Sequence, residues 1–342
     1  MRRFLLVWVV FLATGTALYA QDPQFSQFYA APLYLNPAFA GSTELSRVGL
    51  NFRSQWPAQE TNFTTASVYF DHFFEDFNSG VGLIVNGDRE GLAGLNSVSV
   101  GAQYAYQLAI TDKLTFRPGF QATFYHRDVN FNKLIFGDQL SDRGPTGAPT
   151  GEQLNNGLTT SFFDISLGGL IYNEQFFFGY AAHHITEPNQ SFLGEGEESR
   201  LPMKSSFHAG YKIMLPTGFR TYGYNQKGQE RSITPVANYK MQGPFDQLDV
   251  GAYFTYEPVV FGLWYRGLPI KTLEGNSNNE SIILLVGMIM NNLSVGYSFD
   301  YTISGLGIQS GGAHEISLSY LFSLRDPSIP PKNVRKIPCP KF

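Results

Sequence analysis

An alternation of apolar and polar residues with a period of two recurs along most of this chain and constrains its fold more than any other feature. In LTFRPGFQATFYHR (114–127), Phe116, Phe120 and Phe124 alternate with polar residues that include Arg117 and Arg127. Such a period indicates a β-strand with one apolar and one polar face. We expect about fourteen such strands, which begin near residues 46, 64, 80, 95, 113, 162, 175, 205, 232, 245, 259, 281, 293 and 313.

Two kinds of fold use many strands of this type. A soluble secreted β-protein covers the apolar face with a second sheet, whereas an outer-membrane barrel exposes that face to lipid. The charged fraction of this chain is only 15%, and its aromatic residues, also 15%, gather toward the strand ends. Membrane barrels carry aromatic girdles at these positions. The sequence therefore favours an all-β fold, a transmembrane antiparallel outer-membrane β-barrel of about 14 strands that spans residues 46–324.

The lengths of the predicted connections also favour a membrane barrel, because short periplasmic turns and long outer loops are typical of this class. Short connections fall on one side and long ones on the other. The short ones are 74–79, 109–113, 173–174, 256–258 and 291–292, and the long ones are 128–161, 186–204, 268–280 and 303–312. Connection 216–231 is long where a short turn is expected, so it is either a long periplasmic loop or hides a further strand pair.

The first 20 residues predict a secretory signal peptide. Arg2 and Arg3 precede an apolar run at 4–13, small residues follow, and we expect cleavage after Ala20. The apolar run is shorter than the roughly 20 residues that a membrane-spanning helix needs, and no comparable run follows it. We therefore expect a protein of the cell outer membrane whose mature N- and C-termini are both periplasmic.

Two segments flank the predicted barrel without its period of two. Residues 21–45 are expected to plug the lumen or to dock onto a periplasmic partner. Residues 325–342 are basic and rich in proline, which indicates an extended periplasmic tail. Its Cys339 is the only cysteine, so it is either an inert thiol or the site of an intermolecular covalent contact. The docking candidates are Asp22, Pro23, Phe25, Phe28, Asn36 and Pro37 in the first segment, and Arg335, Lys336 and Cys339 in the second.

Strand parity assigns each charged side chain of the barrel to one face. It predicts lumenal charges of both signs in nearly equal number, which suits an interior crossed by ion pairs or packed by a plug better than a pore selective for one sign. A water-filled channel lined by hydrated charges stays open as an alternative. The predicted lumenal charges are Arg53, Arg117, Arg127, Arg266, Asp71, Asp164, Asp249, Asp300 and Glu315.

Three further patterns bear on chemistry. Segment 281–290 is apolar on both faces, which indicates packing against a plug or loop, or a surface for a partner. His183 and His184 are adjacent in a strand, so we expect their side chains on opposite faces, where they cannot share a metal ion. Neither a Ser/His/Asp relay nor a phosphate-binding glycine loop is visible, so we expect no enzyme and no cofactor.

The formal charge of −4 argues against a nucleic-acid partner.

Several motifs, in order along the mature chain, resemble the PorP/SprF family. They are QDPQFSQF (21–28), LNPAFAG (35–41), RSQW (53–56), FGDQ (136–139), the histidine pair 183–184 followed by PNQ (188–190), YSFDY (297–301) through Gly305, GGAHEIS (311–317) and IPCP (337–340). The resemblance extends over essentially the whole mature chain, and the ordered set is more specific than any one motif.

The resemblance implies an outer-membrane barrel of the type IX secretion and gliding apparatus of Bacteroidota. It implies that the protein supports the export or surface anchoring of a secreted adhesin-like protein that carries a C-terminal sorting domain. It also implies contact with a periplasmic, peptidoglycan-linked component of the machinery, besides the lipid of the outer membrane. The residues alone leave a second hypothesis open, a passive outer-membrane porin or solute channel.

Overall fold

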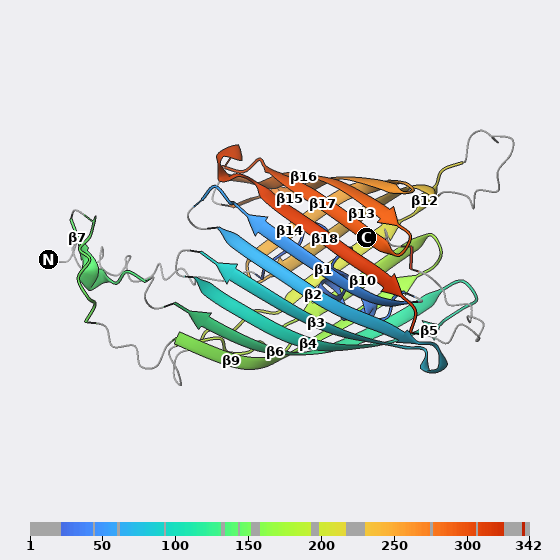
Figure 1. The fold of residues 1–342 in the computed structure, drawn as a ribbon, viewed down its shortest axis with the longest axis horizontal. Coiled ribbons are helices and arrows are strands. Elements are labelled where there is room, and N and C mark those ends of the chain that lie inside the picture. The colour runs from blue at the N-terminus through green and yellow to red at the C-terminus, as the bar shows by residue number, and fades with distance from the viewer. Residues whose placement is uncertain are drawn as a thin grey trace, which may run out of the picture.

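The strands of this protein form one closed antiparallel barrel with 14 strands in the wall (Figure 1). β1 (Ser46–Gln55) pairs with β18 (Ala313–Phe322) and closes the ring. The predicted fold is therefore confirmed. The computed structural model describes residues 22–43, 45–59, 62–91, 94–130, 134–142, 144–151, 158–192, 198–216, 230–273, 276–305, 307–324 and 337–338.

The remaining wall strands follow one another in chain order. They are β2 (Phe63–Phe74), β3 (Ser79–Glu90), β4 (Leu95–Tyr106), β6 (Thr115–Val129), β9 (Leu158–Tyr172), β10 (Phe176–His183), β11 (Lys204–Tyr211), β13 (Arg231–Gln242), β14 (Phe245–Tyr256), β15 (Val259–Leu273), β16 (Asn276–Met290) and β17 (Leu293–Thr302). The short strands β5 (Leu108–Ala109) and β12 (Ile213–Met214) continue β4 and β11, while β7 (Leu140–Ser141) and β8 (Gly144–Pro145) form a separate hairpin. Among the described residues, no helix is both long enough and apolar enough to span a membrane.

The period of two in the sequence appears as two faces of the wall. In β1, Leu50 and Phe52 are exposed on the outside, whereas Asn51 and Arg53 between and beside them are buried inside. Along this strand, polar and charged side chains therefore face the lumen, and apolar side chains cover the outer surface. Closure of the ring pairs the backbone groups that lipid would leave unsatisfied.

The two ends of the barrel differ in their connections. One end, which we call the short-turn end, carries tight turns such as 291–292, and by the general rule for outer-membrane barrels it faces the periplasm. The other, the long-loop end, carries β7 and β8 and lies on the left in Figure 1. One predicted long loop is wrong: β15 and β16 continue as strands through most of 268–280, with register shifts on either side of 267–268 that disturb the alternation. Between β11 and β13 no further wall strand intervenes, because these two strands pair directly.

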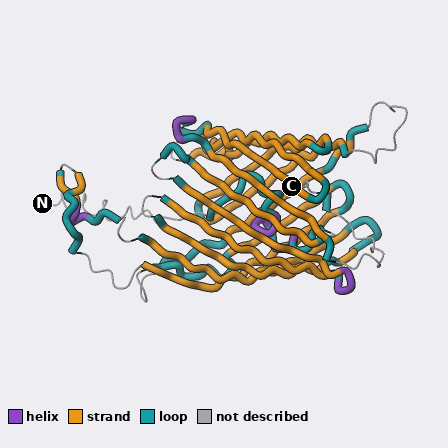
Figure 2. The backbone as a smooth tube through the Cα atoms, in the orientation of Figure 1, coloured by secondary structure: helices purple, strands orange, loops and turns teal. Residues whose placement is uncertain are grey.

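Residues 22–43 precede the barrel and carry two short helical turns, α2 (Pro32–Leu35) and η1 (Pro37–Phe39), which lie within the barrel in Figure 2. Among the described residues, three other single turns, η2 (Glu75–Phe77), η4 (Gly137–Gln139) and η5 (Ile308–Ser310), lie in connections.

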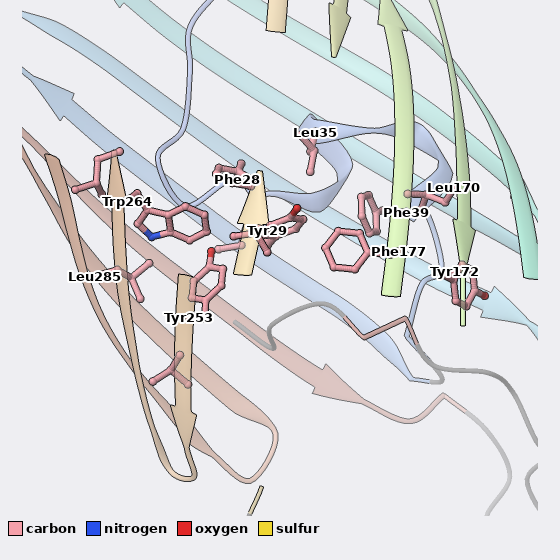
Figure 3. Packing of buried hydrophobic residues seen from close by; sticks show 14 of the residues in the cluster. Phe28, Tyr29, Leu35, Phe39, Leu170, Tyr172, Phe177, Tyr253, Trp264 and Leu285 are labelled. Carbon is pink, nitrogen blue, oxygen red and sulfur yellow. The ribbon is translucent and has the colours of Figure 1, made fainter. Parts of the chain in front are cut away.

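A buried apolar cluster joins residues 22–43 to the wall (Figure 3). Phe28 packs edge-on against Trp264 of β15 at 5.0 Å, and Tyr29 packs edge-on against Phe177 of β10 at 5.3 Å. Ile283 and Leu285 of β16 belong to the same cluster. The apolar lumenal face of segment 281–290 therefore packs against the N-terminal residues, which is one of the two alternatives that its sequence left open.

Candidate functional site

The candidate site is the lumen together with residues 22–43, which we call the lumenal segment. The backbone amide of Asp22 donates to Gln242 at the long-loop end, and the amide of Gly41 donates to Asp71 toward the short-turn end. The segment therefore crosses the lumen from one end to the other before β1 begins at Ser46. Its side chains from Phe25 to Leu33 are almost all fully buried.

Two prolines and one asparagine explain the local path of the segment. Pro32 and Pro37 each occupy the first turn of a short helix, where the fixed backbone angle of proline suits helix initiation. The side chain of Asn36 accepts a hydrogen bond from the amide of Ala38 at 2.8 Å and so caps η1. Its amide group also donates to the carbonyl oxygen of Tyr180 on β10 at 3.0 Å. This one side chain therefore both shapes the segment and fixes it to the wall.

Glycines in the wall give the segment room. A Cβ atom added to Gly80 would lie 1.9 Å from the carbonyl oxygen of Ala40, and one added to Gly119 would lie 2.3 Å from the amide nitrogen of Ala38. A Cβ atom added to Gly168 would lie 2.0 Å from the side-chain oxygen of Asn36. The absence of side chains at these wall positions is therefore what lets the backbone of the lumenal segment approach so closely.

Two arginines and two acids of the wall enclose Ser26; we call them the arginine–carboxylate cradle. The guanidinium of Arg53 lies 2.9 Å from Asp300 and donates to the hydroxyl of Ser26 at 2.7 Å. Arg266 donates to the same hydroxyl at 3.0 Å and to Asp300 at 3.0 Å. Glu315 accepts from the amides of Ser26 and Gln27 at 2.6 and 3.0 Å.

The register of the wall builds this cradle. Arg53 stands directly opposite Glu315 across β1 and β18, and Arg266 stands opposite Asp249 across β14 and β15. Arg266 donates to Asp249 at 2.7 Å with both side chains fully buried. Charges this deeply buried are tolerated only when they are paired and hydrogen-bonded. The cradle therefore supplies buried donors and acceptors that bind the backbone and the hydroxyl of Ser26.

A second set of wall side chains holds the carbonyl groups of the segment. Arg117 donates to the carbonyl oxygen of Ala38 at 3.2 Å and to that of Ala40 at 2.5 Å. Near the short-turn end, Asp71 receives the amide of Gly41 and is held by Arg47 through two hydrogen bonds of 2.8 and 3.0 Å. These contacts fix the segment where it leaves the lumen.

A third anchor lies at the long-loop end. His184 contacts Asp22 at 2.8 Å and Asp164 at 2.9 Å, and the ammonium of Lys204 contacts Asp22 at 2.6 Å. Burial lowers the pKa of His184, but the nearby carboxylates, Asp22 first, outweigh burial and raise this pKa from 6.5 to about 9. His184 is therefore a cation at neutral pH and ties the start of the segment to β9.

The histidine pair differs from the sequence prediction. Both rings are buried, and their centroids lie 6.4 Å apart. His184 follows the last residue of β10 and has a positive φ of 58°, which breaks the alternation and turns its ring inward beside that of His183. The prediction of opposite faces is wrong for this reason. Within the described part of the chain, no group of three or more His, Cys, Asp or Glu side chains is arranged to hold a metal ion.

The other predicted site residues lie as follows. Arg127 is largely buried, contacts Gln190 and lies 4.0 Å from Glu90. Asp22, Pro23, Phe25, Phe28, Asn36 and Pro37 all lie inside the barrel, and whether any of them also contacts a partner stays a prediction. Arg335, Lys336 and Cys339 lie outside the described residues. Next to them, Ile337 packs against the buried apolar cluster and Pro338 is buried.

The lumenal segment runs in the opposite direction to the one that a periplasmic mature N-terminus would give. A periplasmic mature N-terminus would enter at the short-turn end, but Asp22 lies among residues at the long-loop end, and the chain reaches the short-turn end only near Gly41. The sequence identified this segment as a plug or docking element, but it carries no signal for direction, because direction depends on contacts with strands far along the chain.

Parity could have found several further lumenal residues. Arg47 shares the parity of Arg53 on β1, and Lys240 shares that of Asn238 on β13, yet neither was predicted. Gln103 donates to the carbonyl oxygen of Leu33 at 2.7 Å, and Tyr69 donates to that of Ala30 at 3.0 Å. These uncharged residues have no marker in the sequence beyond their inward position.

Beside the lumenal segment, two cavities lie at the long-loop end. The larger, which we call the outer cavity, has a volume of about 420 Å³ and lies between the segment, β11, β13 and the start of β16. The smaller, of about 60 Å³, lies on the other side of the segment, toward β3, β4 and β6. Asp22, Tyr34, His183 and Lys204 border both, so the start of the segment divides the two spaces.

The fold and the site define an outer-membrane β-barrel whose lumen holds the protein's own N-terminal segment. The family model described as type IX secretion system membrane protein PorP/SprF matches residues 17–320. The chain therefore belongs to the PorP/SprF family, and it is a protein of the outer membrane. Among curated proteins, none matches the chain.

Solved structures similar to this chain include two toluene transporters. TbuX of Ralstonia pickettii is 10% identical over 86% of this chain and 94% of that chain, with a TM-score of 0.47. TodX of P. putida is 8% identical over 85% and 93%, with a TM-score of 0.48. A Pseudomonas aeruginosa FadL homologue is 12% identical over 90% and 96%, with a TM-score of 0.44.

Proposed function

We propose that this protein is a non-enzymatic barrel of the type IX secretion and gliding apparatus that supports export or surface anchoring of a secreted adhesin-like protein through that protein's C-terminal sorting domain. The observation that carries the proposal is the lumenal segment. Its aromatic side chains are buried against the wall, Arg53 donates to the side-chain hydroxyl of Ser26, and Arg117 donates to the backbone carbonyl oxygen of Ala40. A lumen filled in this way suits a rigid docking body better than a solute channel.

A passive porin is the second candidate, and it requires an open aqueous path. Phe28 and Leu33 of the lumenal segment are 5% and 0% exposed, so the protein's own chain occupies space that a porin leaves to water. The burial of these side chains in the described part of the lumen supports the docking body over this candidate.

The ends of the chain complete the proposal. We infer that residues 1–20 are removed as a signal peptide, that 21–45 act as the plug of the barrel 46–324, and that the tail 325–342 contacts a periplasmic, peptidoglycan-linked component. Basic residues of the tail would supply electrostatic attraction to an acidic partner. N-terminal sequencing of the protein from outer membranes tests the first boundary: a start at residue 21 is expected, and a retained Arg2 would contradict it.

Purification of the natively expressed, tagged protein from outer membranes in mild detergent tests the main proposal. Mass spectrometry should find one large secreted protein with a C-terminal sorting domain in near-equal amount, and removal of that domain from the secreted protein should abolish its recovery. A barrel that is recovered alone, or a client that is still recovered without its sorting domain, would contradict the proposal.

Substitution of the basic pair in the tail tests the periplasmic contact without deleting the partly buried Ile337. Arg335→Ala combined with Lys336→Ala should reduce recovery of the periplasmic component while leaving recovery of the client unchanged. Arg200→Ala, which removes an exposed cation at the long-loop end, is the matched control. Equal recovery of the periplasmic component from all three proteins would refute a role for the tail.

A further inference from the structure

Two residues that line the outer cavity each carry a buried polar atom that the rest of the described chain leaves unsatisfied. The hydroxyl of Ser206 on β11 and the side-chain oxygen of Asn238 on β13 have no hydrogen-bond partner there, although the residues are only 3% and 1% exposed. Leaving a buried polar group unpaired destabilises the folded protein. Because both residues line the same cavity, a ligand with a donor and an acceptor could satisfy them together.

The positions of these two groups suit an extended peptide. Ser206 stands opposite Lys240 in the pairing of β11 with β13, so Asn238, two residues from Lys240, is its diagonal neighbour on the same lumenal face. Diagonal neighbours in an antiparallel sheet are about 7–8 Å apart. Residues i and i+2 of an extended chain are separated by roughly the same distance, about 7 Å, and direct their backbone groups to the same side. One peptide could therefore donate an N–H to Asn238 and accept the hydroxyl of Ser206.

The charges around the cavity disfavour a charged ligand, because they already have partners within the chain. The pairs are Lys204 with Asp22 at 2.6 Å, Lys240 with Asp249 at 3.4 Å, Lys271 with Asp246 at 2.6 Å, and Arg266 with Glu280 at 3.7 Å. Lys240 also donates to Gln24 at 2.9 Å. A phosphate or carboxylate would have to break one of these pairs, whereas an uncharged ligand leaves them intact.

The apolar part of the lining favours an aliphatic or aromatic side chain over a sugar ring. Phe25, Phe28, Leu35 and Phe245 contribute to it. A sugar needs a free aromatic face on which to stack, but the ammonium of Lys204 already lies 5.2 Å from the centre of the Tyr34 ring. Phe25 packs edge-on against Tyr34 at 5.1 Å, and Phe28 is engaged by Tyr29 at 4.5 Å.

We propose that the outer cavity binds an uncharged, extended peptide segment with an apolar side chain, contributed by the sorting domain of the exported client. This inference rests on the proposed function and adds the site and the chemical class of the ligand to it. The cavity volume of about 420 Å³ falls within the range of ligand sites in proteins. The apolar side chain enters the part of the cavity that Phe25 and Phe245 line, while Asn238 and Ser206 bind the backbone beside it.

The test measures the dissociation constant of the purified full-length mature barrel for the isolated sorting domain of the co-purified client. Asn238→Leu and Ser206→Ala should each weaken binding about tenfold, which corresponds to about 1.4 kcal/mol for one lost hydrogen bond. Asn51→Leu and Ser67→Ala are the matched controls, since these residues are also buried and unpaired but border neither cavity. Both controls should bind as the wild type does. Heat-modifiable migration in gels verifies that every variant is folded.

The outcomes separate this inference from the proposed function. If the wild-type barrel binds the sorting domain and the two cavity variants bind it equally well, the cavity inference is wrong and the proposed function stands. If the wild-type barrel does not bind the domain, both fail. As a competitor, the blocked peptide acetyl-Gly-Leu-Gly-amide should displace the domain. Displacement by the neutral sugar chitotriose instead would overturn the assignment to a peptide.

Discussion

Replacement of Gly119 by alanine should loosen the lumenal segment. Gly119 lies on the lumenal face of β6, and an added Cβ atom would meet the amide nitrogen of Ala38 at 2.3 Å and its Cα at 2.5 Å. Ordinary carbon contacts begin near 3.4 Å, so the segment must move by about 1 Å. Ala38 cannot yield freely, because Asn36 accepts its amide and Arg117 donates to its carbonyl oxygen.

Overpacking of this kind destabilises a well-packed interior by about 1–3 kcal/mol. Urea unfolding of the purified protein in detergent, followed by gel migration, should therefore show a lower midpoint for Gly119→Ala, and limited proteolysis should cut within residues 22–43 at lower protease concentration. Gly87→Ala is the control, because an added Cβ atom there meets nothing within 4 Å. If Gly119→Ala is as stable and as protected as Gly87→Ala, the close packing of the segment against the wall is refuted.

Three further predictions concern the cradle, the outer face and the long-loop anchor. Arg266→Gln leaves buried acids uncompensated and should cost about 3–5 kcal/mol in the free energy of unfolding. Arg200→Gln, which removes an exposed cation beside the exposed Glu198, should leave the urea midpoint nearly unchanged; equal losses in urea unfolding would contradict the cradle. Phe120→Arg places a charge in the lipid-facing wall and should lower the free energy of unfolding by about 2–4 kcal/mol. Phe77→Arg, which places the charge in a turn, should lower it little. A larger loss for Phe77→Arg than for Phe120→Arg would refute the assignment of faces. Because the pKa of His184 is raised to about 9, its stabilising contribution is complete below pH 6.5 and is lost as the pH rises through 9. Protease cleavage near residue 22 should therefore increase between pH 8 and pH 10. A cleavage rate that does not change with pH would contradict this anchor.

Local periodicity was sufficient to predict the wall of the barrel. The alternation in β1, β14 and β17 predicted their first residues, 46, 245 and 293, because a strand that faces lipid on one side and polar groups on the other needs a strict period of two. The alternation fails where a bulge intervenes, and the register shift after Arg266 is the physical reason why the extension of β15 and β16 was predicted as a loop.

The candidate site could be predicted only in part. Parity can place Arg53 and Arg266 on the lumenal face, but their shared contact with Ser26 depends on strand register and on a segment 27 residues upstream of Arg53. The inward turn of His184 depends on one backbone angle after the end of β10. In the sequence, the glycines that leave room for the lumenal segment look like ordinary strand glycines. Their role depends on the close approach of another part of the chain, which the local sequence does not show.

The central claim is that the protein's own N-terminal segment closes the lumen. The most direct test is the conductance of the purified full-length mature protein in planar lipid bilayers. The wild-type protein should form no steady channel at low voltage. Stable, reproducible ion conductance by the wild-type barrel would contradict it and would favour the porin.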